Sequence, residues 1–290
     1  MSAGEWLFSS PADLENFARA LPSRAVGKNL EFHRRLGSTN DRAAQAAAAW
    51  PPAPHGWTVA AEEQTAGRGR HGRRWLAPPG EALLFSLVVR PARKPGGLTA
   101  SRLGWLGLAA GLAASETLTA ETGVRTTVKW PNDLVVGAAP SGGAPWRKLG
   151  GVLCESSLLR PGGAAPFAIL GLGLNVNQTK ARLPEVPKAP PTSLRLERGR
   201  ALDRRRLFAV LLEHLETRLD DLFSEKRFPR LQSELDDHLN RWWEGLVLRV
   251  RSPSGEVQGR YAGLDEGGRL RLDCSGRVLT FADAEILGLE

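Results

Sequence analysis

The sequence predicts an α/β (α+β) protein in which helices flank a mixed β-sheet and a small all-β module follows. Three features of its 290 residues carry this prediction. The run ALLFSLVVR (82–90) is almost continuously apolar, which is typical of a strand covered on both faces. Leu and Ala recur at helical spacing in 99–121 and 203–223. From Gly245 onward, short alternating segments are separated by glycine-containing turns, which indicates a barrel of about five strands.

The other elements follow from local stop and start signals. A short helix at 13–21 ends at Pro22, and Ser38 or Thr39 caps an Ala-rich helix that ends before Pro51. Apolar runs bounded by Gly, Pro and polar residues are typical of strands. Strands are therefore expected at 57–64, 82–90, 127–136, 147–159 and 167–177, with a turn at 137–146 and an irregular Pro-rich stretch at 178–200.

Composition limits the classes of function. The net charge of +8 favours an anionic partner such as a nucleic acid, a nucleotide or an acidic protein. Arg far outnumbers Lys, and Ala, Gly, Pro and Trp are plentiful, which resembles the bias of a GC-rich coding background. Local clusters of charge therefore carry more weight than the total.

Cysteine usage and the N-terminus indicate a reducing compartment. Cys154 and Cys274 lie in unrelated contexts, which argues against a disulfide framework and against a Cys-based zinc site. The start MSAGEWLFSSP lacks a basic region followed by an apolar run, so it does not read as a secretory signal. No stretch approaches the roughly 18 apolar residues of a membrane span. We expect a cytoplasmic protein without a membrane partner.

The segment GRGRHG (67–72) fits the G-x-G-x-x-G pattern that cradles a dinucleotide pyrophosphate. That fingerprint must open a helix, but Pro78, Pro79 and Gly80 follow closely and deny the segment a helix. The arginines of EEQTAGRGRHGRRW (62–75) offer rigid forks suited to phosphate and carboxylate. A loop that closes over an anionic ligand and an exposed RG-rich loop that binds RNA are both open at this point.

Three later stretches also carry polar groups at strand ends. KWPNDL (129–134) places Asn132 and Asp133 after a Pro turn, and RKLGGVLCE (147–155) starts a glycine-containing strand with a lysine. GLGLNVN (171–177) ends in two asparagines that share one face by the period of two, although Asn is a poor strand former. Each stretch alone also fits a plain turn or a solvated strand end.

Together and in this order, the stretches resemble the biotin–protein ligase family. The matched pieces are GSTN (37–40), EQTAGRGRHGRRW (63–75), KWPNDL (129–134), KLGGVL (148–153) and GLGLNVN (171–177). The resemblance spans about residues 27–290. It implies a class II synthetase-like catalytic domain at 27–240 and a C-terminal SH3-like β-barrel at 245–290, with residues 1–26 as a peripheral segment.

The resemblance also implies a reaction. Family members join biotin to ATP, release pyrophosphate, and pass the biotinyl group from biotinyl-5′-AMP to one lysine of a biotin carboxyl carrier protein. It assigns catalysis to Lys148 and Arg70, which would neutralise the substrate carboxylate and the α-phosphate. The biotin contacts it implies are Ser38, Thr39, Asn40, Gln64, Gly67, Arg68, Gly69, Arg70 and Lys148. The nucleotide contacts it implies are Arg73, Trp75, Asn132, Asp133 and Asn175, with Mg²⁺ near Asp133 and with unknown metal ligands.

An acyl-adenylate hydrolyses when wet, so the Arg/Gly loop is expected to be a mobile lid that orders over the intermediate. His71 in the loop is expected to be solvated and without a catalytic role. Family members that repress transcription carry an N-terminal DNA-binding domain, for which about 26 residues are too few, so no DNA partner is expected. The oligomer is expected to be a monomer or a homodimer.

Three rivals to this function remain on the sequence alone. A lipoate–protein ligase shares the fold and the order of steps, but its R-R-x-S-G-G loop is absent here. A basic nucleic-acid-binding protein would explain the charge, but aromatic residues at base-stacking spacing are missing. An inactive homologue would be expected to lose Lys148, Arg70 or Gln64, all of which are present.

Overall fold

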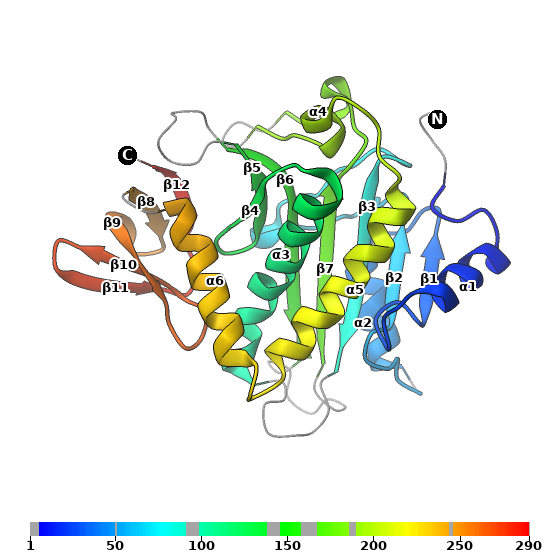
Figure 1. The fold of residues 1–290 in the computed structure, drawn as a ribbon, viewed down its shortest axis with the longest axis horizontal. Coiled ribbons are helices and arrows are strands. Elements are labelled where there is room, and N and C mark those ends of the chain that lie inside the picture. Colours follow the sequence, from blue (N-terminus) through cyan, green and yellow to red (C-terminus); the bar gives the residue numbers. More distant parts are fainter. Residues whose placement is uncertain are drawn as a thin grey trace.

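A mixed sheet forms the centre of the protein, and the helices pack on both of its faces (Figure 1). The computed structural model describes residues 6–49, 51–90, 99–137, 146–157, 167–185, 190–243 and 246–289. Within these ranges seven strands pair in the order β1-β2-β3-β7-β6-β5-β4. The bounds are β1 Leu30–His33, β2 Thr58–Ala61, β3 Ala82–Val89, β4 Thr126–Lys129, β5 Asp133–Val136, β6 Arg147–Ser156 and β7 Ala168–Asn175. β1 and β2 are parallel and every other neighbouring pair is antiparallel.

The helices explain why the central strands are apolar on both faces. The bounds are α1 Pro11–Ala20, α2 Thr39–Ala48, α3 Ala100–Thr122, α4 Leu194–Arg198, α5 Arg204–Leu222 and α6 Phe228–Trp243. α3 and α5 cover one face of the sheet, and the alanines of α2 cover the other, against Val59, Val88 and Ile169. Every residue of β3 is buried, as the apolar run at 82–90 predicts. The predicted mixed sheet flanked by helices is confirmed.

One predicted strand is in fact a hairpin. The expected strand at 127–136 divides into β4 and β5, which pair antiparallel around the turn at 130–132. Pro131 causes the division, because it has no N–H for a ladder and restricts the residue before it. The turn expected at 137–146 lies mostly outside the described residues, as does the end of the strand expected at 147–159.

Four short elements and one longer helix were not predicted from the sequence. The stretch 178–200 is not wholly irregular, since it holds the 3₁₀ turn η4 Lys180–Arg182 and helix α4, capped by Ser193. β1 is only four residues long and half-buried, so its pattern is weak. α6 could have been found, because its buried residues recur every four positions at Leu231, Leu235, Leu239 and Trp243. The other short element, η1 Arg70–Gly72, is part of the site.

Residues 6–26 belong to the main core, so their expected peripheral place needs correction. Leu7, Phe8, Phe17 and Val26 are buried in the same cluster as the sheet and α5. The ring of Phe17 stacks on Phe208 of α5 with a centroid distance of 5.7 Å. Sequence alone could not show this, because Phe208, the stacking partner of Phe17, is almost 200 positions away.

A second, antiparallel sheet follows the last helix. Its strands pair in the order β11-β10-β9-β8-β12, with bounds β8 Val247–Ser252, β9 Gly255–Leu264, β10 Leu270–Cys274, β11 Arg277–Phe281 and β12 Glu285–Leu289. This agrees with the expected small β module. The SH3-like closure and the division between domains at about residue 240–245 stay predictions.

The C-terminal sheet is seated on the central domain by a tight turn. A Cβ on Gly104 of α3 would lie 1.9 Å from the carbonyl oxygen of Gly267, so only glycine allows this approach. The indole N–H of Trp130 donates to the carbonyl of Gly268 at 3.1 Å. α6 lies between the two sheets, where Asp236 accepts a hydrogen bond from Tyr261 (Figure 1). Within the described ranges, every helix is too short or too polar to cross a lipid bilayer.

Candidate active site

The Arg/Gly loop leaves the end of β2 and folds into a small hairpin beside the sheet. The backbone N–H of Gly69 donates to Arg73 at 2.7 Å, and that of Trp75 donates to Gly67 at 2.9 Å. His71 turns the chain with a positive φ of 56° and is exposed. A Cβ on Gly67 would lie 2.5 Å from the carbonyl of Trp75, so glycine is required there. The loop opens no α-helix, which agrees with the rejection of the dinucleotide fingerprint. Its mobility stays a prediction.

A buried polar network joins the start of α2 to this loop. The hydroxyl of Ser38 caps the helix, and Thr39 donates from its N–H (2.8 Å) and its hydroxyl (3.0 Å) to Oε1 of Gln64. Ser86 of β3 lies 2.7 Å from the hydroxyl of Thr39 and donates to Oδ1 of Asn40 at 2.6 Å. Of the five residues in this network, four are buried: Ser38, Thr39, Asn40 and Ser86. Sequence reasoning missed Ser86, although a serine inside an apolar run was a usable signal.

Two glycines of β7, Gly171 and Gly173, form a surface without side chains, the glycine floor, on which this network and the loop pack. A Cβ on Gly171 would lie 2.0 Å from Oδ1 of Asn40, and a Cβ on Gly173 would lie 2.7 Å from the ring of Trp75. Because residues two apart share a strand face, Asn40 and Trp75 lie side by side on the same surface of β7. The sequence therefore has glycine where the site needs close approach.

Arg68 is held between two carboxylates at the outer end of the network. Its guanidinium lies 2.7 Å from Asp41 and 3.0 Å from Glu155, and Glu155 also accepts from Asn40 at 2.7 Å. Burial favours the neutral form of Arg68, but the carboxylates of Glu155 and Asp41 outweigh it and raise the pKa of Arg68.. The side chain of Arg68 is thus paired with two carboxylates.

Lys148 lies at the start of β6, on the other side of Trp75. Its ammonium donates to Asp133 at 2.6 Å and lies 5.8 Å from the centroid of the Trp75 ring. Lys129 is a second cation near this carboxylate; burial lowers its pKa and the charge of Asp133 partly opposes this. The β4–β5 hairpin thus brings the polar end of KWPNDL to Lys148.

Two further loop arginines, Arg70 and Arg73, reach across to the C-terminal segment. Arg70 donates to Oδ1 of Asn132 at 3.4 Å and forms an ion pair with Asp283. Arg73 pairs with Glu285 at 3.1 Å. The two acidic partners were not expected from the sequence, which contained no signal that β12 would reach the loop.

Asn175 has a structural partner at each end of its amide. Its Nδ2 donates to the carbonyl of Thr192 at 3.0 Å, and its Oδ1 accepts from Gln178 at 3.0 Å. The residue is 4% exposed. Its role as a nucleotide contact stays a prediction, and these bonds show that it holds the segment before α4 against β7.

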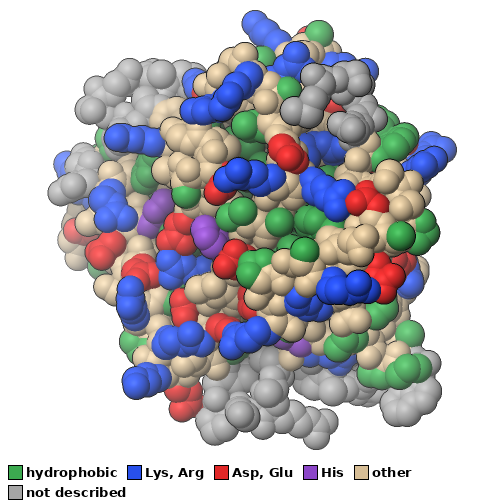
Figure 2. All heavy atoms as spheres, turned by 45° about the vertical axis from the view of Figure 1, so that its right-hand side comes forward, with side chains coloured by type: hydrophobic (Ala, Val, Ile, Leu, Met, Phe, Trp, Pro, Cys, Tyr) green, Lys and Arg blue, Asp and Glu red, His purple; other side chains and the backbone are tan. Residues whose placement is uncertain are grey.

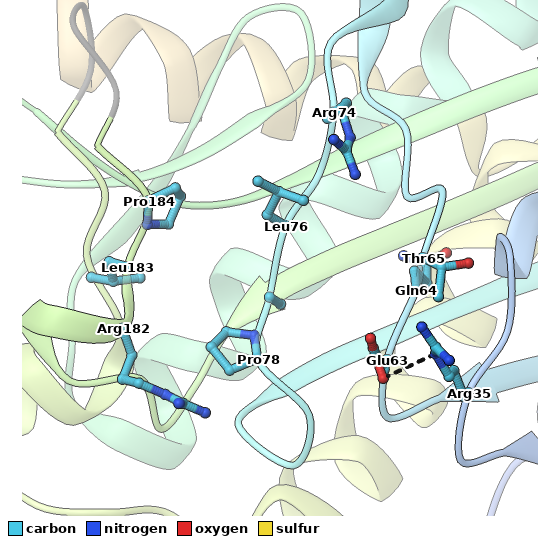
Figure 3. Close-up of a pocket in the computed structure, with 11 residues that line it drawn as sticks. Arg35, Glu63, Gln64, Thr65, Arg74, Leu76, Pro78, Arg182, Leu183 and Pro184 are labelled. Carbon is cyan, nitrogen blue, oxygen red and sulfur yellow. Dashed lines mark ion pairs between the residues drawn. The ribbon is translucent and has the colours of Figure 1, made fainter.

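A cavity of about 410 Å³ opens on the outer side of the loop (Figure 3). It is lined by Arg35, residues 63–65, residues 74, 76–78 and residues 182–184. Figure 3 shows Arg35 facing Glu63, with which it pairs at 3.5 Å. Of the predicted site residues only Gln64 lines this cavity, so the predicted site lies mainly on the inner side of the loop. In the described part of the chain, no three His, Cys, Asp or Glu side chains cluster in a way that could hold a metal ion.

Comparison with known proteins identifies the family. Residues 32–175 match the Biotin/lipoate A/B protein ligase family. A biotin–acetyl-CoA-carboxylase ligase of Mycobacterium tuberculosis is 36% identical over 282 residues, which cover 93% of this chain and 95% of that protein. A bifunctional ligase/repressor BirA of Bacillus subtilis is 29% identical, covering 92% of this chain and 76% of that protein. The structure of a biotin protein ligase from Aquifex aeolicus in complex with biotin and ATP superposes with a TM-score of 0.69 at 27% identity, covering 91% of this chain and 99% of that chain. Because a biotin–acetyl-CoA-carboxylase ligase is 36% identical over nearly the whole of both chains, this protein belongs to the biotin protein ligase family.

Proposed function

We propose that this protein is an ATP-dependent ligase that converts biotin to biotinyl-5′-AMP and transfers the biotinyl group to a lysine of a biotin carboxyl carrier protein. One observation carries the proposal. The fold brings the Thr39–Gln64 network, the glycine floor of β7 and Lys148 together around Trp75, although they are distant in the sequence. The full-length similarity to a biotin–acetyl-CoA-carboxylase ligase supports the same substrate.

The first step joins two anions, so the site must supply fixed positive charge. The carboxylate of biotin attacks the α-phosphate of ATP, and pyrophosphate leaves. Lys148 is the proposed cation between the two groups, since a charge preorganised in a partly buried site stabilises the developing transition state. Asp133 orients its ammonium at 2.6 Å. Arg70 supplies a second cation from the loop.

The ureido ring of biotin needs neutral, oriented polar partners. It offers two N–H donors and one carbonyl acceptor, and the network supplies amide and hydroxyl groups in a buried place. Oε1 of Gln64 and the hydroxyls of Ser38 and Thr39 are the proposed partners, with Asn40 beside them. Ser86 holds Thr39 and Asn40 in position. Buried polar groups of this kind select a ligand strongly, because a ligand without matching groups leaves them unsatisfied.

The loop is proposed to exclude water from the mixed anhydride. Gly67 and Gly69 let its backbone approach the ligand, and Arg68 and Arg70 flank it. The indole N–H of Trp75 is buried and lacks a hydrogen-bond partner among the described residues. A buried donor without a partner is uncommon, and a bound substrate would satisfy it. This supports Trp75 as the cover of the intermediate.

The nucleotide is proposed to bind on the Lys148 side of Trp75. The proposed nucleotide contacts in this region are Arg73, Asn132 and Asp133. Asn175 is a further proposed contact. Mg²⁺ is typically held by one or two carboxylates together with substrate phosphates and water. Asp133 fits that donor chemistry, so it is the proposed carboxylate for a metal that would neutralise phosphate charge.

A purely basic nucleic-acid-binding protein is less well supported. On the face drawn in Figure 2, Lys and Arg side chains are mixed with Asp and Glu side chains. Three of the loop arginines already have carboxylate partners. The absence of a DNA partner, a cytoplasmic location and a monomeric or homodimeric state stay predictions.

The decisive experiment supplies the purified protein with biotin, ATP, Mg²⁺ and a biotin carboxyl carrier domain. We expect pyrophosphate release that depends on biotin, and a carrier that streptavidin then detects. Lys148→Ala should abolish both signals, and lipoate in place of biotin should give neither. Failure of the wild-type protein to release pyrophosphate with biotin would overturn the proposal.

A further inference from the structure

The turn before β12 brings the carboxylate of Asp283 into contact with Arg70, a proposed catalytic residue. We propose that Asp283 is a positioning residue that holds Arg70 for the adenylation step; this inference rests on the function proposed above. Asp283 lies in the turn just before β12 and pairs with the Nη2 of Arg70. Asp283 also lies 3.4 Å from Nε2 of His71, an exposed loop residue to which no catalytic role is assigned, so Arg70 is the predicted site residue through which Asp283 would act.

Arg70 is held from two sides. Its Nη1 lies 3.4 Å from Oδ1 of Asn132, and its Nη2 meets Asp283. Asn132 is itself fixed, because its Nδ2 donates to the carbonyl of Val152 at 2.8 Å and its own carbonyl accepts from the N–H of Val152 at 2.9 Å. A free arginine side chain has large rotamer entropy, which must be lost before it can meet a phosphate. Two anchors remove that freedom before the substrate binds.

Both anchors of Arg70 are connected to the contact between the central sheet and the C-terminal sheet. Asn132 follows Trp130 by two residues, and Trp130 bonds to the turn that seats the C-terminal sheet. The turn before β12 is fixed by the buried side chains of Ala284 and Ile286. Ile286 pairs with Val250 in the same sheet. The distance between the two anchors of Arg70 is therefore set by the docking of the two sheets.

The neighbouring pair between Arg73 and Glu285 is weaker by the same reasoning. The side chain of Arg73 is 64% exposed, against 26% for Arg70. An ion pair between exposed side chains contributes little, because water screens it and its side-chain entropy is costly. Of these two carboxylates, Asp283 is therefore the one that restrains its arginine more.

The test compares three variants in steady-state pyrophosphate release. Asp283→Ala should lower kcat/KM for ATP by roughly twofold to fivefold, the range expected when a partly exposed ion pair loses its orienting effect. The KM for biotin should change little. Asp283→Glu should recover part of the loss. The matched control is Glu256→Ala, which removes a carboxylate of similar exposure (45%, against 49% for Asp283) that pairs with Arg251 on the same sheet, and it should leave the rates unchanged.

A double-mutant cycle separates positioning from a general structural role. In an Arg70→Ala background, Asp283→Ala should have no further effect, because the residue it positions is gone. An equal loss in both backgrounds, or wild-type rates in Asp283→Ala, would overturn this inference while the proposed function stands. A wild-type protein that releases no pyrophosphate would overturn both.

Discussion

Replacing Gly171 with alanine tests the contact between β7 and Asn40. The added Cβ would lie 2.0 Å from Oδ1 of Asn40, whereas real Cβ atoms essentially never approach closer than 3.0 Å, so the amide must retreat by about 1 Å. It would then lose its hydrogen bond with Ser86 (2.6 Å) and strain the one with Glu155 (2.7 Å).

The magnitude follows from the burial of this network. Leaving a buried polar group unsatisfied costs about 1–3 kcal/mol of the free energy of unfolding. In a protein of this size each 1 kcal/mol lowers the melting temperature by roughly 2–4 °C. If Asn40 borders the biotin site, a loss of about 1–2 kcal/mol in binding makes the Kd for biotin roughly five- to thirtyfold weaker.

Calorimetry measures both effects on one preparation: a thermal scan gives the melting temperature and a titration gives the Kd for biotin. Gly37→Ala is the matched control, because a Cβ there meets nothing within 4 Å and the residue adjoins the same helix. Unchanged biotin affinity and an unchanged melting temperature in Gly171→Ala would show that the network does not hold Asn40 as described.

Three further changes test other parts of the structure. Lys148→Met should reduce the rate of pyrophosphate release by roughly a hundred- to a thousandfold with an unchanged thermal midpoint, because it removes a preorganised charge; a rate near wild type would exclude Lys148 from the chemistry. Glu62→Gln should lower the free energy of unfolding in urea by about 1.5–3 kcal/mol, because the buried guanidinium of Arg204 loses the charge of its hydrogen-bonded carboxylate at 2.7 Å; an unchanged free energy would mean that this charge does not contribute. Burial, with a smaller effect of Arg241, lowers the pKa of His238 from 6.5 to about 4. The unfolded chain therefore binds this proton more tightly, and stability should rise between pH 4 and 6.5 by at most about 1.4 kcal/mol per pH unit; His238→Gln should flatten this slope in urea titrations, and an identical slope would contradict the assignment.

The sequence was sufficient for those features that neighbouring residues encode. Burial on both faces of β3 follows from its unbroken apolar run, and the cap of α2 follows from Ser38 before an alanine-rich stretch. The family could also be anticipated, because the stretches that contain Lys148, Gln64 and the Arg/Gly loop together resemble the biotin–protein ligase family, and the roles of these residues stay predictions. The hairpin inside 127–136 was missed although a turn at Pro131 was expected, because the whole stretch was interpreted as one strand.

The partners of these residues were decided only by the tertiary structure. Ser86 meets Asn40 across 46 positions of sequence, and Arg70 meets Asp283 across 213. Local periodicity specifies which face of a strand or helix is apolar, but it contains no information about which distant segment will cover that face. The covering segment is determined by the pairing of the strands and by the close approach of Gly104 to the turn of the second sheet. A side chain at position 104 would clash with that turn, so the two sheets can pack this closely only with glycine there.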